Sequence, residues 1–128
     1  MALKSFRELV VWQRSMQLVL DVYKLTQSLP SHERFGLASQ MQRSAVSIPT
    51  NIAEGYGRTS TREYLRFLEI ARGSLQELDT LLELVSRLRY ESPPRCEVLQ
   101  TQIVDIRRLL AALIRALLRR EASRNAKA

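Results

Sequence analysis

Apolar residues recur at spacings of three and four along nearly the whole chain, which is the periodicity of amphipathic α-helices. The pattern predicts four helical segments separated by short breaks. The first segment begins at Ser5, which forms a capping box with Glu8, and it ends at Pro30. Two apolar seams run along this segment, so we expect it to contact neighbours on more than one side. The seams are Leu9, Trp12, Met16, Val19 and Tyr23, and Val11, Leu18, Val22, Leu25 and Leu29.

The second segment opens between Ser31 and Gly36 and ends at Gly55 and Gly57. Pro49 lies inside it. A proline in a helix interior removes a hydrogen-bond donor and clashes with the carbonyl four residues earlier, so we expect a kink. The other faces of this segment carry small or polar side chains, which permit close approach by another helix or subunit. Its predicted core positions are Leu37, Met41, Ala45, Ile48 and Ile52.

The third and fourth segments repeat the apolar pattern with fewer interruptions. Ser60 and Glu63 form a second capping box, and the third segment is predicted to extend to Tyr90. Ser92 and the two prolines after it fit the first turn of the fourth segment. The predicted core positions are Phe67, Ala71, Ser74, Leu78, Leu81, Val85 and Leu88 in the third segment, and Leu99, Ile103, Ile106, Leu110, Leu113 and Leu117 in the fourth.

Short breaks make consecutive helices antiparallel neighbours. The predicted fold class is therefore all-α, an antiparallel up-down-up-down four-helix bundle with a kinked second helix. A length of 128 residues suits one domain, and 4 Gly and 4 Pro are too few for the turns of a many-stranded sandwich or barrel. We expect residues 1–122 to form the single bundle domain and residues 123–128 to be a flexible basic tail.

The composition leaves little room for metal or catalytic chemistry. One Cys and one His cannot assemble a zinc site from this chain. A di-iron bundle needs Glu-x-x-His pairs on facing helices, whereas His32 falls in a break. Cys96 has no histidine placed beside it for a catalytic dyad. We expect no metal site, no cofactor and no enzymatic activity.

The same composition suggests where the protein resides. A lone reduced thiol fits the cytoplasm. No uncharged stretch approaches the roughly 18 residues of a membrane-spanning helix, and charged residues interrupt the N-terminal segment before a signal-peptide core could form. We expect a cytoplasmic protein with no membrane partner.

The net charge of +7 is concentrated at one end of the chain. Residues 107–128 contain seven basic residues against one acidic residue, a net charge of +6. Clustered arginine favours contact with a phosphate backbone, and the alternative is a solvated helix end whose cations favour the negative pole of the helix dipole. Anionic lipid is less favoured because the apolar face of this segment is committed to the core. Two arrays carry the arginines: Arg58, Arg62 and Arg66 at the start of the third segment, and Arg107, Arg108, Arg115 and Arg119 in an arc of about 120° on the fourth.

The Gly55-Tyr56-Gly57 sequence resembles part of a phosphate-binding glycine fingerprint, but it follows a helix rather than a strand, so helix termination explains it better. Free amides at the start of the third segment lie next to Arg58, where a phosphate could dock. We expect Asn51 and Glu54 to make buried hydrogen bonds rather than to act in acid-base catalysis. No second carboxylate or nucleophile lies beside them at helical spacing.

The string SIPTNIAEGYGR at residues 47–58 resembles the signature of a bacterial four-helix-bundle family associated with intervening sequences in large-subunit ribosomal RNA. FRELVVWQ near the start and EYLRFLEIARGSLQELDTLLELVSRL in the third segment are also similar to that family's pattern, so the similarity covers residues 6–118. The matching positions are Trp12, Pro49, Asn51, Ile52, Ala53, Glu54, Gly55, Arg58, Phe67, Gly73, Ser74 and Glu77.

This resemblance implies a cytoplasmic homo-oligomer, typically a ring-like pentamer of antiparallel bundles, with no catalytic residues to transfer. Related accessory variability proteins of diversity-generating retroelements share the fold and bind nucleic acid and a reverse transcriptase. The partners expected on this basis are further copies of the chain, RNA or DNA, and a protein such as a reverse transcriptase. The basic C-terminal segment is not part of the family signature.

Two functions follow from these observations. The first is a non-enzymatic homo-oligomeric scaffold that binds the nucleic-acid backbone through its two arginine arrays. The broad apolar arcs of the first and third segments motivate the oligomer. The second is a protein-protein interaction adaptor that binds no nucleic acid, whose arginines pair with acidic residues of another chain.

Overall fold

A computed structural model describes residues 3–127, and within that range every regular element is helical. The all-α prediction is therefore confirmed. The four α-helices are α1 (Val10–Thr26), α2 (Leu37–Tyr56), α3 (Thr61–Arg87) and α4 (Pro93–Lys127). Two single-turn 3-10 helices, η1 (Phe6–Glu8) and η2 (Ser31–Glu33), precede α1 and α2.

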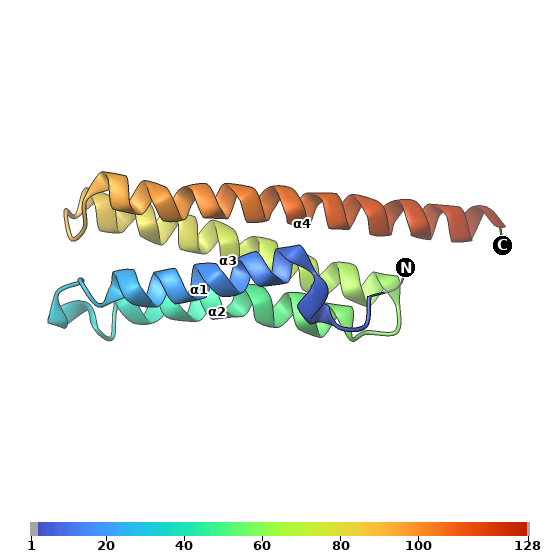
Figure 1. The fold of residues 1–128 in the computed structure, drawn as a ribbon, viewed down its shortest axis with the longest axis horizontal. Coiled ribbons are helices and arrows are strands. Elements are labelled where there is room, and N and C mark those ends of the chain that lie inside the picture. The colour runs from blue at the N-terminus through green and yellow to red at the C-terminus, as the bar shows by residue number, and fades with distance from the viewer. Residues whose placement is uncertain (1–2, 128) are drawn as a thin grey trace.

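The helices lie side by side along one long axis and alternate in direction (Figure 1). α2 contacts α1 and α3, and α4 contacts α3 and α1. In the described part of the chain, the diagonal pairs α1–α3 and α2–α4 bring no Cα atoms within 8 Å of each other. This is the predicted up-down-up-down bundle. α4 is the longest helix, with 35 residues, and its C-terminal end runs past the connection between α2 and α3 (Figure 1).

The core contains most of the predicted apolar positions, with informative exceptions. Only one of the two seams of α1 is fully buried, the one that contains Leu18 and Val22. In the other seam Met16 and Tyr23 are 39% and 43% exposed, so this seam forms an outward face beside α2. The largest fully buried side chains are Leu18, Leu25, Met41, Ile48, Ile52, Leu68, Leu75, Leu78, Leu82, Ile103, Ile106 and Leu110.

One predicted core position, Leu88, is wrong, and three others, Leu37, Ser74 and Leu113, are only half-buried. Leu88 is 50% exposed because α3 has already ended at Arg87. On α4 the buried position is Ile114, whereas Leu113 is only half-buried. Leu110 before it and Leu117 after it are buried as predicted, so the predicted face of α4 holds except that Ile114 takes the place of Leu113.

The predicted cap is confirmed at Ser60 of α3 and corrected for α1. Ser60 caps α3, since its hydroxyl accepts the N–H of Glu63 at 3.1 Å. Ser5 caps η1 instead of α1, because Leu9 is extended and α1 begins one residue later. α3 ends at Arg87, before the predicted end at Tyr90, and Arg89 beyond it has a left-handed φ of 61°.

α2 runs as one helix through the buried Pro49. A kink at that residue stays a prediction. α4 continues as helix through residues 123–127, and Ala128 lies outside the described residues. That this tail is flexible also stays a prediction. No helix in the described range is long and apolar enough to cross a membrane.

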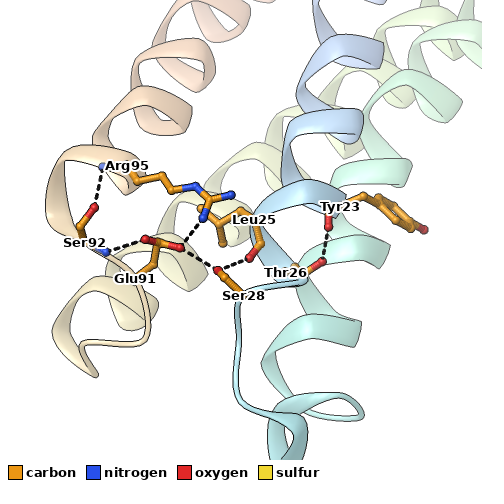
Figure 2. A network of polar contacts seen from close by, with 7 residues as sticks. All are labelled: Tyr23, Leu25, Thr26, Ser28, Glu91, Ser92 and Arg95. Atoms are coloured by element: carbon orange, nitrogen blue, oxygen red, sulfur yellow. Dashed lines mark hydrogen bonds and ion pairs between the residues drawn. The ribbon is translucent and has the colours of Figure 1, made fainter.

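A polar network joins two connections at one end of the bundle (Figure 2). The Ser28 hydroxyl, just after α1, donates to the Glu91 carboxylate at 2.7 Å, and the Ser92 N–H donates to its other oxygen at 3.0 Å. Arg95 forms an ion pair with the same carboxylate. The hydrogen bond from Ser28, followed by that from the Ser92 N–H and by the charge of Arg95, holds the pKa of Glu91 below its usual value.

The pH dependence of stability tests this network. The pKa of Glu91 is depressed in the folded state, so ionised Glu91 stabilises the fold above the ordinary glutamate pKa, and this contribution disappears as the pH falls through the folded-state pKa. We expect Glu91→Gln to lower the free energy of unfolding by about 1 kcal/mol near neutral pH, and we expect this difference to shrink at acidic pH as Glu91 of the wild type becomes protonated. Urea denaturation at neutral and at acidic pH measures the difference. The exposed Glu97→Gln is the control, and an effect of Glu91→Gln that is the same at both pH values contradicts this role.

A close contact between α2 and α3 is testable at Gly55. A Cβ at this position would lie 2.9 Å from the Phe67 Cβ and 3.2 Å from the Tyr64 carbonyl oxygen, so Gly55→Ala should lower the free energy of unfolding by about 1–3 kcal/mol. At Gly57, which caps α2, the nearest atom would be 3.6 Å away, so Gly57→Ala should change little. Chemical denaturation compares the two variants, and equal losses would contradict this account.

Candidate nucleic-acid interface

Three of the predicted arginines form an exposed row on α4. Arg108, Arg115 and Arg119 are all exposed, and none has an ion-pair partner within the described residues. The flanks of α4 are marked by hydrogen bonds to its neighbours, from Gln102 to Asp21 of α1 and from Gln100 to Asp79 of α3. The three arginines lie between these flanks and face solvent. We call Arg108, Arg115 and Arg119 the α4 arginine row.

The fourth predicted arginine of α4, Arg107, has different surroundings. Its guanidinium donates to the Gln76 side-chain oxygen at 2.5 Å and lies 3.4 Å from the Asp79 carboxylate, both on α3. Arg107 is therefore held against α3 with its charge paired. It can contribute to the surface potential, but it is less available than the α4 arginine row for a new phosphate contact.

In the second predicted array, at the start of α3, two of the three arginines are held by contacts within the chain. Arg58 lies 3.8 Å from the Glu54 carboxylate, and Arg66 lies 3.2 Å from that of Glu63. Both guanidiniums also lie over the Phe67 ring, 4.7 and 5.4 Å from its centroid. Arg62 is exposed and has no ion-pair partner in the part of the chain that the structure describes. Both ion pairs are solvent-exposed, so a phosphate can compete for these arginines.

The tertiary structure brings the last part of the α4 array to the α3 array at one end of the bundle, whereas Arg107 contacts Gln76 near the middle of α3. α3 and α4 are antiparallel, so the first turns of α3 lie beside the last part of α4 (Figure 1). Burial, together with Tyr56, raises the pKa of Tyr64 to about 12, and the positive charge of Arg120 opposes that rise. Arg120 therefore lies close enough to the first turn of α3 to act on Tyr64. Sequence reasoning missed Arg120, although its place in the basic C-terminal segment was visible.

The polar residues of the family-like string serve the packing of α2 on α3. The Asn51 amide donates to the Ser47 carbonyl at 2.8 Å and to the Ser47 hydroxyl at 3.0 Å, and the Ser74 hydroxyl donates to the Ser47 hydroxyl at 2.8 Å. The expected hydrogen-bonding role of Asn51 is confirmed. The expectation of a buried hydrogen bond is wrong for Glu54, which is exposed and pairs with Arg58.

The other motif positions are also in packing contacts. Trp12 is half-buried, and its ring meets the edge of Phe6 at a centroid distance of 5.2 Å. Pro49 is buried in α2. Gly55 lies in the last turn of α2, where it allows close approach to α3, and Gly57 caps the helix, so the predicted helix end is confirmed.

The titratable residues outside the arginine arrays have structural surroundings. His32 is exposed and lies 3.3 Å from the Tyr90 hydroxyl. Cys96 is buried, and burial raises the pKa of its thiol, which disfavours the nucleophilic thiolate. Among residues 3–127, no group of three or more His, Cys, Asp and Glu side chains is placed to hold a metal ion. The chemistry offered by this surface is the binding of anions by exposed guanidinium groups.

Comparisons with known proteins agree with the fold. Residues 7–112 match the sequence profile of the 23S rRNA-intervening sequence protein family. A crystal structure from Bacteroides thetaiotaomicron VPI-5482, of a protein with unknown function from the S23 ribosomal protein family, is similar, with a TM-score of 0.77 and 27% identity. That match covers 82% of this chain and 98% of the other. No curated protein matches this chain. The last basic residues, Arg115, Arg119, Arg120, Arg124 and Lys127, lie beyond the family match.

Proposed function

Because the chain belongs to the 23S rRNA-intervening sequence protein family, we propose that it is a non-enzymatic homo-oligomeric scaffold, a ring-like pentamer, that binds the backbone of RNA or DNA. The observation that carries this proposal is the α4 arginine row. Its three guanidiniums face solvent on the side of α4 away from the core, and they have no carboxylate partner within the described residues.

The dimensions of the α4 arginine row suit a phosphate backbone. From Arg108 to Arg119 the helix rises about 16 Å, which is comparable to the axial length of about five base pairs. The row contains no aromatic side chain on which a base could stack. Contacts of this kind hold the phosphates without reading the bases, so the binding is electrostatic and insensitive to sequence.

The oligomer increases this attraction. Each copy in a symmetric assembly repeats the same arginines, so the positive potential over one end of the assembly exceeds that of one chain. The outward apolar face of α1 and α2 supports self-association, since Leu20 is 61% exposed and Met16, Tyr23 and Val46 are about 40% exposed. Arg62 and Arg120 would extend the positive surface around the end of each bundle.

The triple variant Arg108→Gln, Arg115→Gln, Arg119→Gln tests the proposal. We expect its affinity for a short RNA or DNA duplex to fall about tenfold or more in low salt, and the slope of log affinity against log salt to lose about three units. Fluorescence anisotropy over a salt series measures both quantities. The control Arg14→Gln, Arg72→Gln, Arg87→Gln removes the same charge elsewhere and should bind nearly as the wild type does. Unchanged binding by the first variant contradicts the proposal, and an acidic protein recovered after nuclease treatment would favour an adaptor instead.

A pair of single variants distinguishes free from paired arginines. Arg107→Gln should reduce affinity for the same duplex less than Arg115→Gln, because Asp79 and Gln76 already hold the Arg107 guanidinium. The same titrations measure the two affinities, and circular dichroism checks that both variants fold. A larger loss from Arg107→Gln would mean that nucleic acid binds the flank between α3 and α4 instead.

A further inference from the structure

The outward side of α3 carries a second row of residues at the spacing of a coiled-coil seam. Its members are separated by three, four, three and four residues, and all of them are exposed. At about 100° per residue they fall within an arc of about 80°, on the side of α3 away from its core residues Leu68, Leu75 and Leu82. We call this set the α3 row: Ile70, Gly73, Glu77, Thr80 and Leu84.

Gly73 in the α3 row has no function in the packing of a single chain. A Cβ at this position would meet no atom within 4 Å. A glycine in a helix interior costs about 1 kcal/mol of stability relative to alanine, and no close contact in the described chain requires it. A glycine between two exposed apolar residues, Ile70 and Leu84, allows another helix to approach closely at this point.

A matching row lines a groove beside α2. The residues follow spacings of four, three, four and three, and three adjoining hollows of about 620, 480 and 370 Å³ run along them, each large enough for several side chains. The first two hollows share Ser39, and the last two share Val46 and Thr50. Trp12 and Met16 of α1 line the opposite wall of the last hollow. We call this set the α2 row: Ser39, Arg43, Val46, Thr50 and Ala53.

The charges of the two rows are complementary. The described residues that line the groove include Arg34 and Arg43 and no carboxylate. Glu77 is the one charged residue of the α3 row. Neither Arg43 nor Glu77 has an ion-pair partner within residues 3–127, whereas the nearby Glu69 and Glu83 are paired with arginines of α3 itself.

The two rows also lie at the same height along the bundle. The hydrogen bond between Ser74 and Ser47 marks one common level of α3 and α2. Because the helices are antiparallel, Arg43 lies about 6 Å and Glu77 about 4.5 Å from this level in the same direction. At the same rise per residue, the ends of the α2 row and the α3 row lie at heights along the bundle that agree within about 3 Å.

We infer that the α2 row of one copy packs antiparallel against the α3 row of a second copy, with Arg43 of one beside Glu77 of the other. This inference rests on the proposed homo-oligomeric function and names the surfaces that form the assembly. The two rows lie on different faces, so each copy offers one row to each of two neighbours, and such a contact closes into a ring when the rotation permits. A rotation about an axis parallel to the bundle preserves height, which keeps Arg43 level with Glu77. The basic end of α4 does not suit the groove, because Arg34 and Arg43 would repel it.

Charge reversal tests the contact by light-scattering mass measured across a concentration series. The wild type should have a mass that is a multiple of the chain mass of 14.8 kDa. Arg43→Glu alone and Glu77→Arg alone should each weaken association by about tenfold or more, because each places like charges together. The double variant Arg43→Glu, Glu77→Arg should associate again, because the carboxylate placed at position 43 of one copy then meets the guanidinium placed at position 77 of the next.

Further variants separate association from folding. The Cβ of Gly73→Leu would meet no atom within 4 Å in the single chain, and Gly73 is exposed, so the variant should fold normally and still weaken association. Arg14→Glu and Glu97→Arg reverse exposed charges outside both rows and should leave the mass unchanged. Circular dichroism confirms helix content for every variant.

The outcomes distinguish this inference from the proposed function. A wild type that is monomeric at all concentrations overturns both the oligomeric scaffold and the contact. An oligomeric wild type that is unaffected by Arg43→Glu, Glu77→Arg and Gly73→Leu overturns the contact alone. Failure of the double variant to associate overturns the pairing of Arg43 with Glu77.

Discussion

Burial of one aliphatic core between four antiparallel helices constrains the direction of every other side chain in this protein. Each helix contacts its two neighbours around the bundle, so each has a core side, two flanks and an outward side. On α3, burial of Leu68, Leu75 and Leu82 turns Ile70 and Leu84 outward, because a helix advances by about 100° per residue. On α4, burial of Ile106 and Leu110 places Arg108 on the solvent side by the same geometry.

The antiparallel order also separates two kinds of polar chemistry along the bundle axis. At one end, the Glu91 carboxylate accepts hydrogen bonds that join the α1–α2 and α3–α4 connections (Figure 2). At the other end, exposed arginines of α3 and α4 come together around the overhanging C-terminal part of α4 (Figure 1). Polar groups at the first end satisfy one another, whereas guanidiniums at the second end remain available to an external anion.

Most of the fold was predictable because helical periodicity and capping are local. Ser60 caps α3 as its spacing to Glu63 predicts, and the repeating leucines and isoleucines locate the core. The errors arise where burial depends on neighbours. The seam with Met16 and Tyr23 has the same periodicity as the buried seam of α1, yet these two residues are exposed, because no further helix within residues 3–127 covers them. Leu113 and Ile114 are adjacent and similar, so only the position of α4 against its neighbours distinguishes them.

The sequence by itself determined the number, order and alternating direction of the helices, and it placed the excess positive charge in residues 107–128, because these properties need only spacing, short breaks and composition. Tertiary structure alone decided that Arg107 is ion-paired to α3 while Arg115 has no ion-pair partner among residues 3–127, and that the charge of Arg120 acts on Tyr64 of α3. It likewise decided that Arg43 and Glu77 share a height on separate faces. These relationships join residues distant in the chain, and only the packing of one helix on another sets them.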